Sequence, residues 1–290
     1  MPKYSFATAA TVDEAVRLLN EPEVRSIPLG GGTDIFVALR VNPLWFDRLV
    51  DITHVPELHH IGVADGVVSI GAAVTFTQAL ESELLQGVAP FLACACENVG
   101  GPAIRNSGTL GGNVANAAAC ADSLPALVCL DAVVHLLSPA GERALPISEF
   151  VSGPHQTNIQ PGELITHFSF AQPPAGARSA FIKIGRRRAQ SISRLSIAAI
   201  GTTNAGGAID YIRITPGAAT PKTIRFTPVE DMLKGQPPTR ELFVRAGEAM
   251  SAEMISVTGR RWSTPYKEIA LKAITERVLA AIFLQEAQPC

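Results

Sequence analysis

The sequence predicts an α+β protein that is divided into more than one domain. Two glycine-rich stretches, around residues 30 and 110, each lie between apolar segments of the length of a strand or a helix. A Pro-rich segment at 171–179 then interrupts the chain, and such a composition is typical of a domain boundary. Beyond it, three strand-like runs are followed by two helical ones, which indicates a separate α+β unit.

The composition is that of a soluble globular protein. The chain has 290 residues, of which 47% are hydrophobic and 17% charged, and its formal net charge is −2. At about 100–200 residues per domain, this length allows two domains. The near-neutral charge gives no electrostatic reason to expect nucleic acid or an anionic membrane as a partner. No apolar run approaches the ~18–20 residues of a membrane span, and the N-terminus lacks a hydrophobic signal core, so we expect a cytoplasmic protein.

The first part of the chain, up to about residue 55, is expected to form a small β-rich unit with covering helices. Thr11 and Glu14 introduce an apolar pattern of helical spacing, which predicts a capped amphipathic helix. Strands are expected at 24–29 and 48–52, because both runs are short, apolar and bounded by turn residues.

The first glycine-rich stretch, Gly30 to Gly32, lies between a strand and an apolar helical run. Consecutive amides in such a loop form an anion-binding concavity, to which the helix N-terminus adds unpaired N–H groups. Thr33 or Asp34 would cap that helix. Ile35 stands where a Rossmann fingerprint has its third glycine, and the Gly-Lys-Ser/Thr end of a P-loop is also missing. We therefore expect a nucleotide that is bound by neither of those two motifs.

The second glycine-rich stretch spans 100–124. Gly111 and Gly112 carry no Cβ, so a ligand can approach their amides directly. Thr109 and Asn113 add hydrogen-bonding side chains. This combination suits a large, flat, partly anionic ligand such as a dinucleotide. The alternative is a tight turn between packed elements, and the presence of the first glycine cluster favours the ligand.

Strands and helices alternate through the middle of the chain. Asp65-Gly66 separates two short strand patterns, which predicts a hairpin. A capped helix is expected at 75–82, and residues 124–137 form either a buried helix or a pair of strands. A further strand at 163–170 leads into the Pro-rich boundary.

The last part of the chain is expected to form an antiparallel sheet of three strands, at 180–188, 193–204 and 208–218. Helices at 241–254 and 266–284 follow it. The composition thus divides the chain into residues 1–55, 56–174 and 175–290.

Four segments together resemble the FAD-binding subunit of molybdenum hydroxylases, a family that includes the xanthine, nicotinate and CO dehydrogenase flavoprotein subunits. These segments are GGTDI at 31–35, IRNSGTLGGNVAN at 104–116, ADSLPAL at 121–127 and YKEIALKAI at 266–274. The resemblance covers essentially the whole chain. It implies a two-subdomain FAD-binding domain of the vanillyl-alcohol-oxidase type, at 1–55 and 56–174, and a C-terminal α+β domain at 175–290.

The same resemblance implies which residues hold FAD. A first motif wraps the pyrophosphate and consists of Leu29, Gly30, Gly31, Gly32, Thr33, Asp34 and Ile35. A second motif touches the pyrophosphate and the flavin side and consists of Thr109, Leu110, Gly111, Gly112 and Asn113. Leu110 takes the place of a residue near the redox-active edge of the flavin. Single contacts are implied for Asp122, for Ile165 with Leu164 as the alternative, and for Lys183, which would reach the cofactor from the C-terminal domain.

Each single contact also has a structural interpretation. Asp122 precedes an apolar run and is equally explained as a helix cap. Lys183 is followed by three arginines, and a basic cluster is usually a solvated face. Ile165 belongs in the core of any fold. The six histidines show no metal spacing and are expected to be surface or capped residues. No residue is expected to be catalytic or to bind a metal.

The function implied by the resemblance is that of an electron-transfer flavoprotein subunit. It would take electrons from iron–sulfur clusters of one partner subunit and pass them through FAD to NAD(P) or another acceptor. Substrate would be hydroxylated at a molybdopterin cofactor in another partner subunit, and the complex would be a dimer of heterotrimers. Two alternatives are a self-contained FAD-dependent oxidoreductase acting on its own small substrate and a nucleotide-binding module without a redox role.

The segment after Lys183, IGRRRAQSISR, is implied to lie near the flavin face where the acceptor docks. Arg186, Arg187 and Arg188 make it strongly positive. Arginine binds phosphate groups bidentately, so the segment suits NAD(P). The alternative is that these arginines bind carboxylates of a neighbouring subunit.

Overall fold

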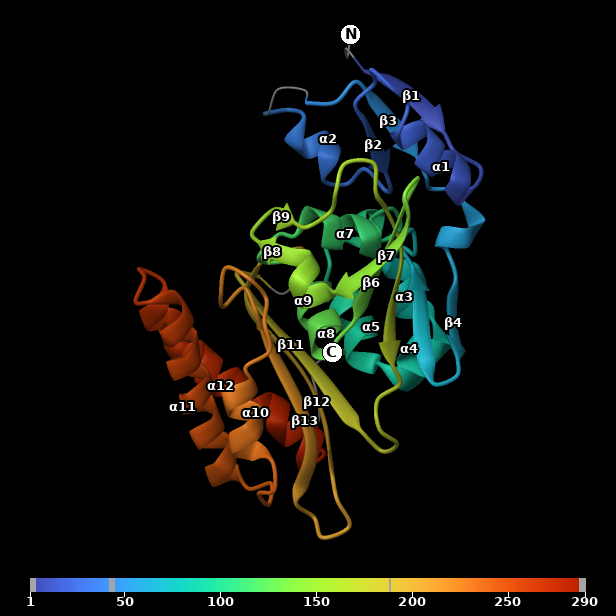
Figure 1. Ribbon diagram of the computed structural model, residues 1–290. Helices are drawn as coiled ribbons and strands as arrows, with labels where there is room; N and C mark the ends of the chain where they lie inside the picture. The colour runs from blue at the N-terminus through green and yellow to red at the C-terminus, as the bar shows by residue number, and fades with distance from the viewer. Residues whose placement is uncertain (1–3, 42–44, 188, 287–290) are drawn as a thin grey trace.

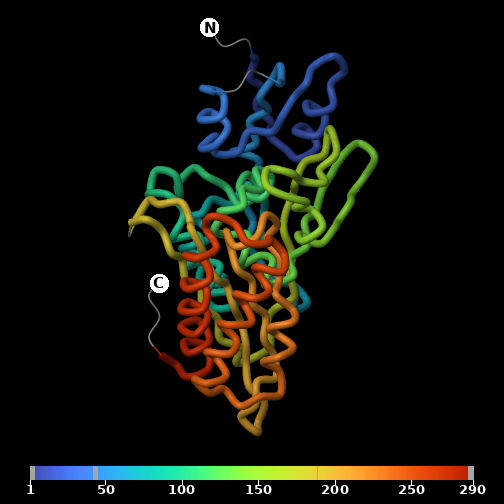
Figure 2. The backbone as a smooth tube through the Cα atoms, turned by 90° about the vertical axis from the view of Figure 1, so that its left-hand side faces the viewer, coloured from blue at the N-terminus to red at the C-terminus, as the bar shows by residue number. Residues whose placement is uncertain are grey.

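The computed structural model describes residues 4–41, 45–187 and 189–286. Three larger sheets follow one another along the chain, and the element order is shown in Figure 1. The first sheet lies at one end of the molecule, the five-stranded sheet in the middle and the last sheet at the other end (Figures 1 and 2). Each sheet is built from one of the three expected stretches, although their independence as domains stays a prediction.

The first unit is a parallel sheet of three strands in the order β1-β3-β2, with helix α1 packed on it. The Thr11 hydroxyl accepts a hydrogen bond from the Glu14 amide at 3.1 Å, so the predicted cap of α1 is confirmed. The predicted order of strand, glycine loop and helix around residue 30 is also confirmed. The elements are β1 (Ser5–Thr8), α1 (Val12–Leu19), β2 (Ser26–Leu29), α2 (Ile35–Ala38) and β3 (Arg48–Asp51).

The second unit contains an antiparallel sheet of five strands in the order β4-β5-β10-β6-β7. Asp65 and Gly66 both have positive φ, 50° and 74°, which confirms the predicted hairpin between β4 and β5. The strands are β4 (Ile61–Ala64), β5 (Val67–Gly71), β6 (Val133–Ser138), β7 (Gly141–Pro146) and β10 (Leu164–Ala171), and a separate pair is formed by β8 (Val151–Gly153) and β9 (Gln156–Thr157).

Helices of the second unit cover one face of this sheet with their apolar residues. Residues 124–137 form neither a single helix nor two strands, because α8 gives way to strand β6 at Asp131, whose φ is +50°. The helices are η1 (Pro56–Leu58), α3 (Phe76–Glu81), α4 (Glu83–Val88), α5 (Pro90–Glu97), α6 (Pro102–Arg105), α7 (Leu110–Asn116), α8 (Ser123–Cys129) and α9 (Ile147–Phe150).

The third unit is the predicted antiparallel sheet of three strands, and this prediction is confirmed. One face of the sheet packs on α5 and α8, and the other is covered by three C-terminal helices (Figure 1). Sheets and helices therefore alternate in four layers. The elements are β11 (Arg178–Gly185), β12 (Ser193–Thr203), β13 (Ile209–Gly217), α10 (Thr227–Leu233), α11 (Arg240–Thr258) and α12 (Thr264–Phe283).

No helix in these described ranges combines the length and the apolar character that a membrane crossing requires.

Candidate functional site

The two glycine-rich loops, distant in the sequence, lie directly against each other. A Cβ atom added to Gly31 would lie 1.6 Å from the carbonyl oxygen of Ser107, which is backbone of the second loop. A Cβ added to Gly30 would lie 2.9 Å from the Thr109 hydroxyl oxygen. Glycine is therefore required at position 31 because two main chains approach too closely for any side chain. The structure thus brings the two predicted motifs together.

The first loop presents a row of unpaired backbone donors. In the described part of the chain, no acceptor is found for the amides of Gly30, Gly31, Gly32, Thr33 and Asp34. Most of these residues are only partly exposed, and partly buried amides normally have a hydrogen-bond partner. Five consecutive free donors at the start of α2 suit a ligand with anionic oxygens, such as a pyrophosphate.

The expectation that Thr33 or Asp34 caps α2 with its side chain is wrong. Asp34 occupies the N-cap position but makes no capping hydrogen bond. Its backbone is near-helical, with φ −107° and ψ −50°, whereas a capping side chain requires an extended backbone. Gly32 has φ +69°, which favours glycine and turns the loop. The amides at the start of α2 therefore stay open.

In the second loop, the amides of Leu110 to Asn113 are already bonded. The Leu110 amide donates to the Val74 carbonyl at 2.9 Å, and the Gly111 amide donates to the Ala72 carbonyl at 2.8 Å. Within the loop, the Thr109 hydroxyl accepts a hydrogen bond from the Gly112 amide, and the Thr109 carbonyl accepts one from the Asn113 amide. The expectation that a ligand approaches the amides of this glycine pair is therefore wrong.

Gly111 is a glycine for a packing reason. Its φ is not positive, and an added Cβ would lie 2.6 Å from the Ala72 carbonyl oxygen. Helix α7 thus packs closely against Ala72, which directly follows β5, and this contact alone explains why residue 111 is a glycine. The side chain of Asn113 offers this motif a group that is open to a ligand. Asn113 accepts a hydrogen bond from Ser123 through Oδ1 at 2.7 Å, and its Nδ2 has no acceptor among the described residues.

The apolar members of the predicted site lie beneath the loops. Leu110 is fully buried in the main core, so it supports the second loop from below. Ile165, on β10, belongs to the same core cluster, whereas Leu164 packs with α1 in another. This separation favours Ile165 over the alternative Leu164. Leu29 and Ile35 meet in a small cluster beneath the first loop.

Asp122 and Lys183 form a buried ion pair that links the second unit to the third. The Lys183 ammonium lies 2.6 Å from Asp122 Oδ2, and each side chain is 8% exposed. The ammonium also donates to the Asn98 carbonyl at 2.8 Å, and the Ser193 hydroxyl donates to Asp122 Oδ1 at 2.5 Å. Burial raises the pKa of Asp122 above its ordinary value, and the pair with Lys183 and the Ser193 bond oppose that rise.

This geometry decides both structural interpretations of the pair. Asp122 stands at the N-cap of α8 but makes no capping hydrogen bond, so the interpretation as a helix cap is wrong. Lys183 is buried, so it is not part of a solvated basic face. The two residues that were each expected to contact the cofactor also hold one another. Their partners Asn98 and Ser193 were missed, because nothing in the local sequence marks either residue.

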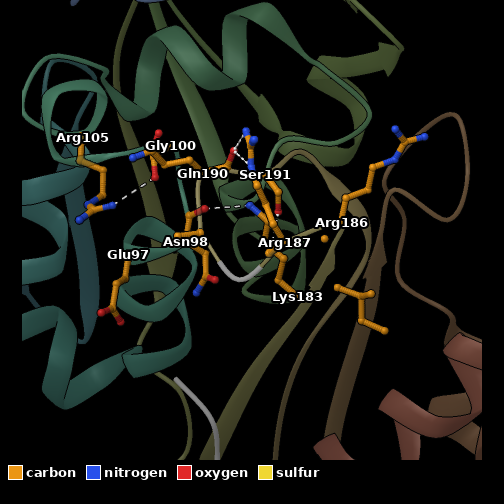
Figure 3. A pocket seen from close by; sticks show the side chains of 12 residues that line it. Glu97, Asn98, Gly100, Arg105, Lys183, Arg186, Arg187, Gln190 and Ser191 are labelled. Carbon is orange, nitrogen blue, oxygen red and sulfur yellow. Dashed lines mark hydrogen bonds between the residues drawn. The ribbon is translucent and has the colours of Figure 1, made fainter.

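A cavity of about 680 Å³ opens beside Lys183. In Figure 3, Asn98, Gly100 and Arg105 line one side, and the segment after β11 lines the other. Arg187 donates twice to the Gln190 carbonyl, at 3.1 and 2.6 Å, and so closes that segment into a loop. The remaining lining residues are Glu97, Lys183, Ile184, Gly185, Arg186, Ala189 and Ser191. Arg188 lies outside the described residues.

The charged residues that line the cavity are mostly cationic, and the lining includes no residue of either glycine motif. Arg105, Lys183, Arg186 and Arg187 line it, against one carboxylate, Glu97. It therefore suits an anionic ligand or ligand part. Only the short helix α6 separates its rim at Gly100 from the second glycine loop. The first glycine loop, with its open amides, is the better anion site, and the cavity extends the same face.

Three histidines gather at the five-stranded sheet, a grouping that the sequence did not predict. The rings of His135 and His167 stack at 3.9 Å between centroids, and His60 lies 5.8 Å from His167. Burial and the other two rings lower the pKa of His167 to about 4. Among the described residues, no group of His, Cys, Asp and Glu has an arrangement that holds a metal ion.

Comparison with known proteins gives two family matches that cover most of the chain. The family described as FAD binding domain in molybdopterin dehydrogenase matches residues 2–172. The family described as CO dehydrogenase flavoprotein C-terminal domain matches residues 180–282.

Individual relatives match over nearly their whole length. The chain is 32% identical to the xanthine dehydrogenase FAD-binding subunit of Escherichia coli O157:H7, over 95% of this chain and 94% of the relative. It is 27% identical to the nicotinate dehydrogenase FAD-subunit of Eubacterium barkeri, over 100% of this chain and 99% of the relative. Among solved structures, a chain of the carbon monoxide dehydrogenase of Hydrogenophaga pseudoflava superposes with a TM-score of 0.90 at 26% identity, over 99% of both chains.

Proposed function

We propose a function for this chain from one established premise: it belongs to the family of FAD-binding subunits of molybdenum hydroxylases. Its relatives are subunits of dehydrogenases, so the chain is an oxidoreductase subunit with an FAD-binding domain and a C-terminal domain. The proposal concerns how this chain holds FAD, which partners it joins and where the electrons go.

We propose that the pyrophosphate of FAD binds on the open amides of Gly30 to Asp34. The observation that carries this proposal is the row of five amides without acceptors in the described part of the chain. Two flexible phosphate charges match several fixed N–H dipoles better than they match one cationic side chain. Leu29 and Ile35 would anchor the ends of the loop through the cluster beneath it.

The second motif would act mainly as a rigid wall for the cofactor. Gly111 and Leu110 fix the position of this motif through backbone hydrogen bonds to Ala72 and Val74, in the segment that follows β5. Gly112, which is exposed, and the free Nδ2 of Asn113 would then face the cofactor, next to the Thr109 hydroxyl.

Asp122, Ile165 and Lys183 would position the cofactor from below and from the side. The Lys183 ammonium uses two of its three donor positions inside the protein and lines the cationic cavity with its remaining surface. Ile165 would act through the core beneath the second motif, and Asp122 would hold Lys183 in place.

Bound FAD supplies the redox chemistry, since it accepts and releases electrons and no residue of this chain needs to do so. We propose that the electrons come from iron–sulfur clusters of one partner subunit, and that molybdopterin resides in a second partner subunit. The relatives include medium chains of multi-subunit dehydrogenases, which supports such partners. A dimer of heterotrimers, NAD(P) as acceptor, a cytoplasmic location and domain boundaries near 55 and 175 complete the proposal.

Expression of the chain alone tests this function. We expect a yellow protein that carries non-covalent FAD and turns over no organic substrate by itself. Bleaching of the bound flavin by a small organic substrate would instead identify a self-contained oxidoreductase. A folded protein that binds no flavin even on titration with FAD would contradict the proposed cofactor and favour a nucleotide-binding module.

A further inference from the structure

The N-terminal end of α12 exposes an unusual set of large apolar side chains. Trp262 is 88% exposed, and Tyr266 and Ile269 follow it at helical spacing with 43% and 73% exposure. Ile192, on the segment before β12, is 75% exposed and lines the same groove as Trp262 and Tyr266. Exposed apolar groups that gather in one place mark interaction sites, whereas single ones are ordinary.

Ile192, Trp262 and Tyr266 border a groove of about 580 Å³ that lies between the segment after β11 and α12, whereas Ile269 lines a separate pocket. Trp262 and Tyr266 form one side, and Arg186, Arg187 and Ser191 form the other. The segment that carries Arg187 and Gln190 also lines the cavity beside Lys183. We call this groove, together with its exposed apolar residues Ile192, Trp262 and Tyr266, the α12 face.

The charges on the α12 face are all positive. Among the described residues, four cationic ones line the groove and no Asp or Glu does. Within the described ranges, no ion pair is formed by Arg186, Arg187, Arg194 or Lys267. The Arg194 guanidinium lies over the Tyr266 ring at 5.8 Å from its centroid, so a cation and an aromatic ring are presented together.

We infer that the α12 face is the docking surface for an acidic partner subunit of the complex, one that presents carboxylates around an apolar pocket for Trp262. Trp, Tyr and Arg are the residues most enriched where protein interfaces gain their energy. The unpaired arginines call for carboxylates on the partner. This inference rests on the proposed function, because it assumes that the chain works with partner subunits.

A second copy of this chain is a poor occupant. In a twofold dimer the same patch meets itself, so the arginines of one copy would face those of the other. Such like-charge contact is unfavourable, whereas an acidic partner turns the same charges into attraction. Since Arg186, Arg187, Gln190 and Ser191 border both the α12 face and the cavity beside Lys183, the partner would sit next to the proposed cofactor site.

The test is assembly of the co-expressed complex with variants of this chain. We expect Trp262→Ala and Arg194→Glu each to weaken subunit association by about tenfold or more, and added salt to weaken the wild-type complex. Flavin content and the melting temperature of the isolated chain should stay unchanged. The matched controls are Trp45→Ala and Arg178→Glu, which alter an exposed tryptophan and an exposed arginine elsewhere.

The possible outcomes separate the two proposals. Assembly of both α12-face variants at wild-type strength would overturn this inference while leaving the proposed function intact. Quenching of Trp262 fluorescence by NAD(P), with unaffected assembly, would overturn it in favour of a nucleotide site. If the wild-type flavoprotein forms no complex with any co-expressed subunit, the proposed function itself fails.

Discussion

The two glycine motifs are alike in sequence and differ in how their backbones are used. At Gly30 to Asp34 the amides point at no acceptor in the described structure. At Leu110 to Asn113 every amide is already bonded, two to the chain around Ala72 and Val74 and two to Thr109 of the same loop. Both motifs are rich in glycine because chain packs on chain, as the contacts of Gly31 and Gly111 show. A glycine-rich motif therefore indicates that two backbone segments pack closely. Whether the motif also binds a ligand depends on how many of its amides lack an acceptor.

The largest effect is expected at Gly31. Gly31→Ala places a Cβ atom 1.6 Å from the Ser107 carbonyl oxygen, so the two loops must separate. We expect loss of nearly all flavin and a fall in the free energy of unfolding of more than about 3 kcal/mol. Flavin absorbance of the purified protein and thermal unfolding measure the two effects.

The matched control for this change is Gly62→Ala. Gly62 lies on β4, an added Cβ meets nothing within 4 Å, and its φ is not positive. It should keep both its flavin and its stability. A Gly31→Ala protein with wild-type flavin content would show that the contact between the loops does not matter for the site.

Gly111 should behave differently, because its role is packing. Gly111→Ala places a Cβ 2.6 Å from the Ala72 carbonyl oxygen, and relief of that contact should cost about 1–3 kcal/mol of stability. The fraction that remains folded should still bind FAD with one flavin per chain. Denaturant unfolding gives the stability, and flavin-to-protein ratio after gel filtration gives the occupancy. A Gly111→Ala variant that is stable but has lost its flavin would show that Gly111 contacts the cofactor.

Acid should destabilise the strands that hold the second motif before it affects the first motif. The Ala72 amide donates to the Thr166 carbonyl, and the next residue is His167. The pKa of His167 is lowered from 6.5 to about 4, so the unfolded chain binds its proton first as the pH falls. Stability should therefore decline between pH 6.5 and 4. His167→Gln should make this decline in the free energy of unfolding less steep. The control His54→Gln changes an exposed histidine of the first unit and should leave the decline unchanged. Equal slopes for the wild type and both variants would rule this account out.

The smallest effect is expected at Thr109, where the two motifs touch. Its hydroxyl caps α7 by accepting from the Gly112 amide at 3.0 Å. Thr109→Ala should cost about 1 kcal/mol of stability through the lost cap. FAD affinity should fall only slightly, because the amides of the first loop remain. Thr109→Ser, which keeps the hydroxyl, serves as the control, and a large loss of affinity in the alanine variant alone would move the cofactor toward the second loop.

Local patterns were sufficient to predict most of the fold. The hairpin at Asp65-Gly66 and the cap at Thr11 depend on residues a few positions apart, and both are present. The three-stranded C-terminal sheet follows from three adjacent strand patterns, so it too was predictable. By contrast, residues 124–137 were ambiguous, because a short apolar run has no periodicity that separates helix from strand.

The site was predictable in position and less so in chemistry. The resemblance located both loops, but free and bonded amides depend on carbonyls such as that of Ala72, which lies far away in the sequence. Asp122 and Lys183 are 61 positions apart, and each alone suggested a different role. Their pairing depends on how the third sheet packs on α8, which no local pattern encodes.

The most direct test of the central claim is residue-resolved amide hydrogen exchange with and without FAD. If the open amides of Gly30 to Asp34 bind the pyrophosphate, their exchange should slow strongly when FAD is added. The amides of Leu110 to Asn113, already bonded within the protein, should change far less. Unchanged exchange at residues 30–34 in protein that has taken up FAD, with new protection confined to residues 110–113, would contradict the account.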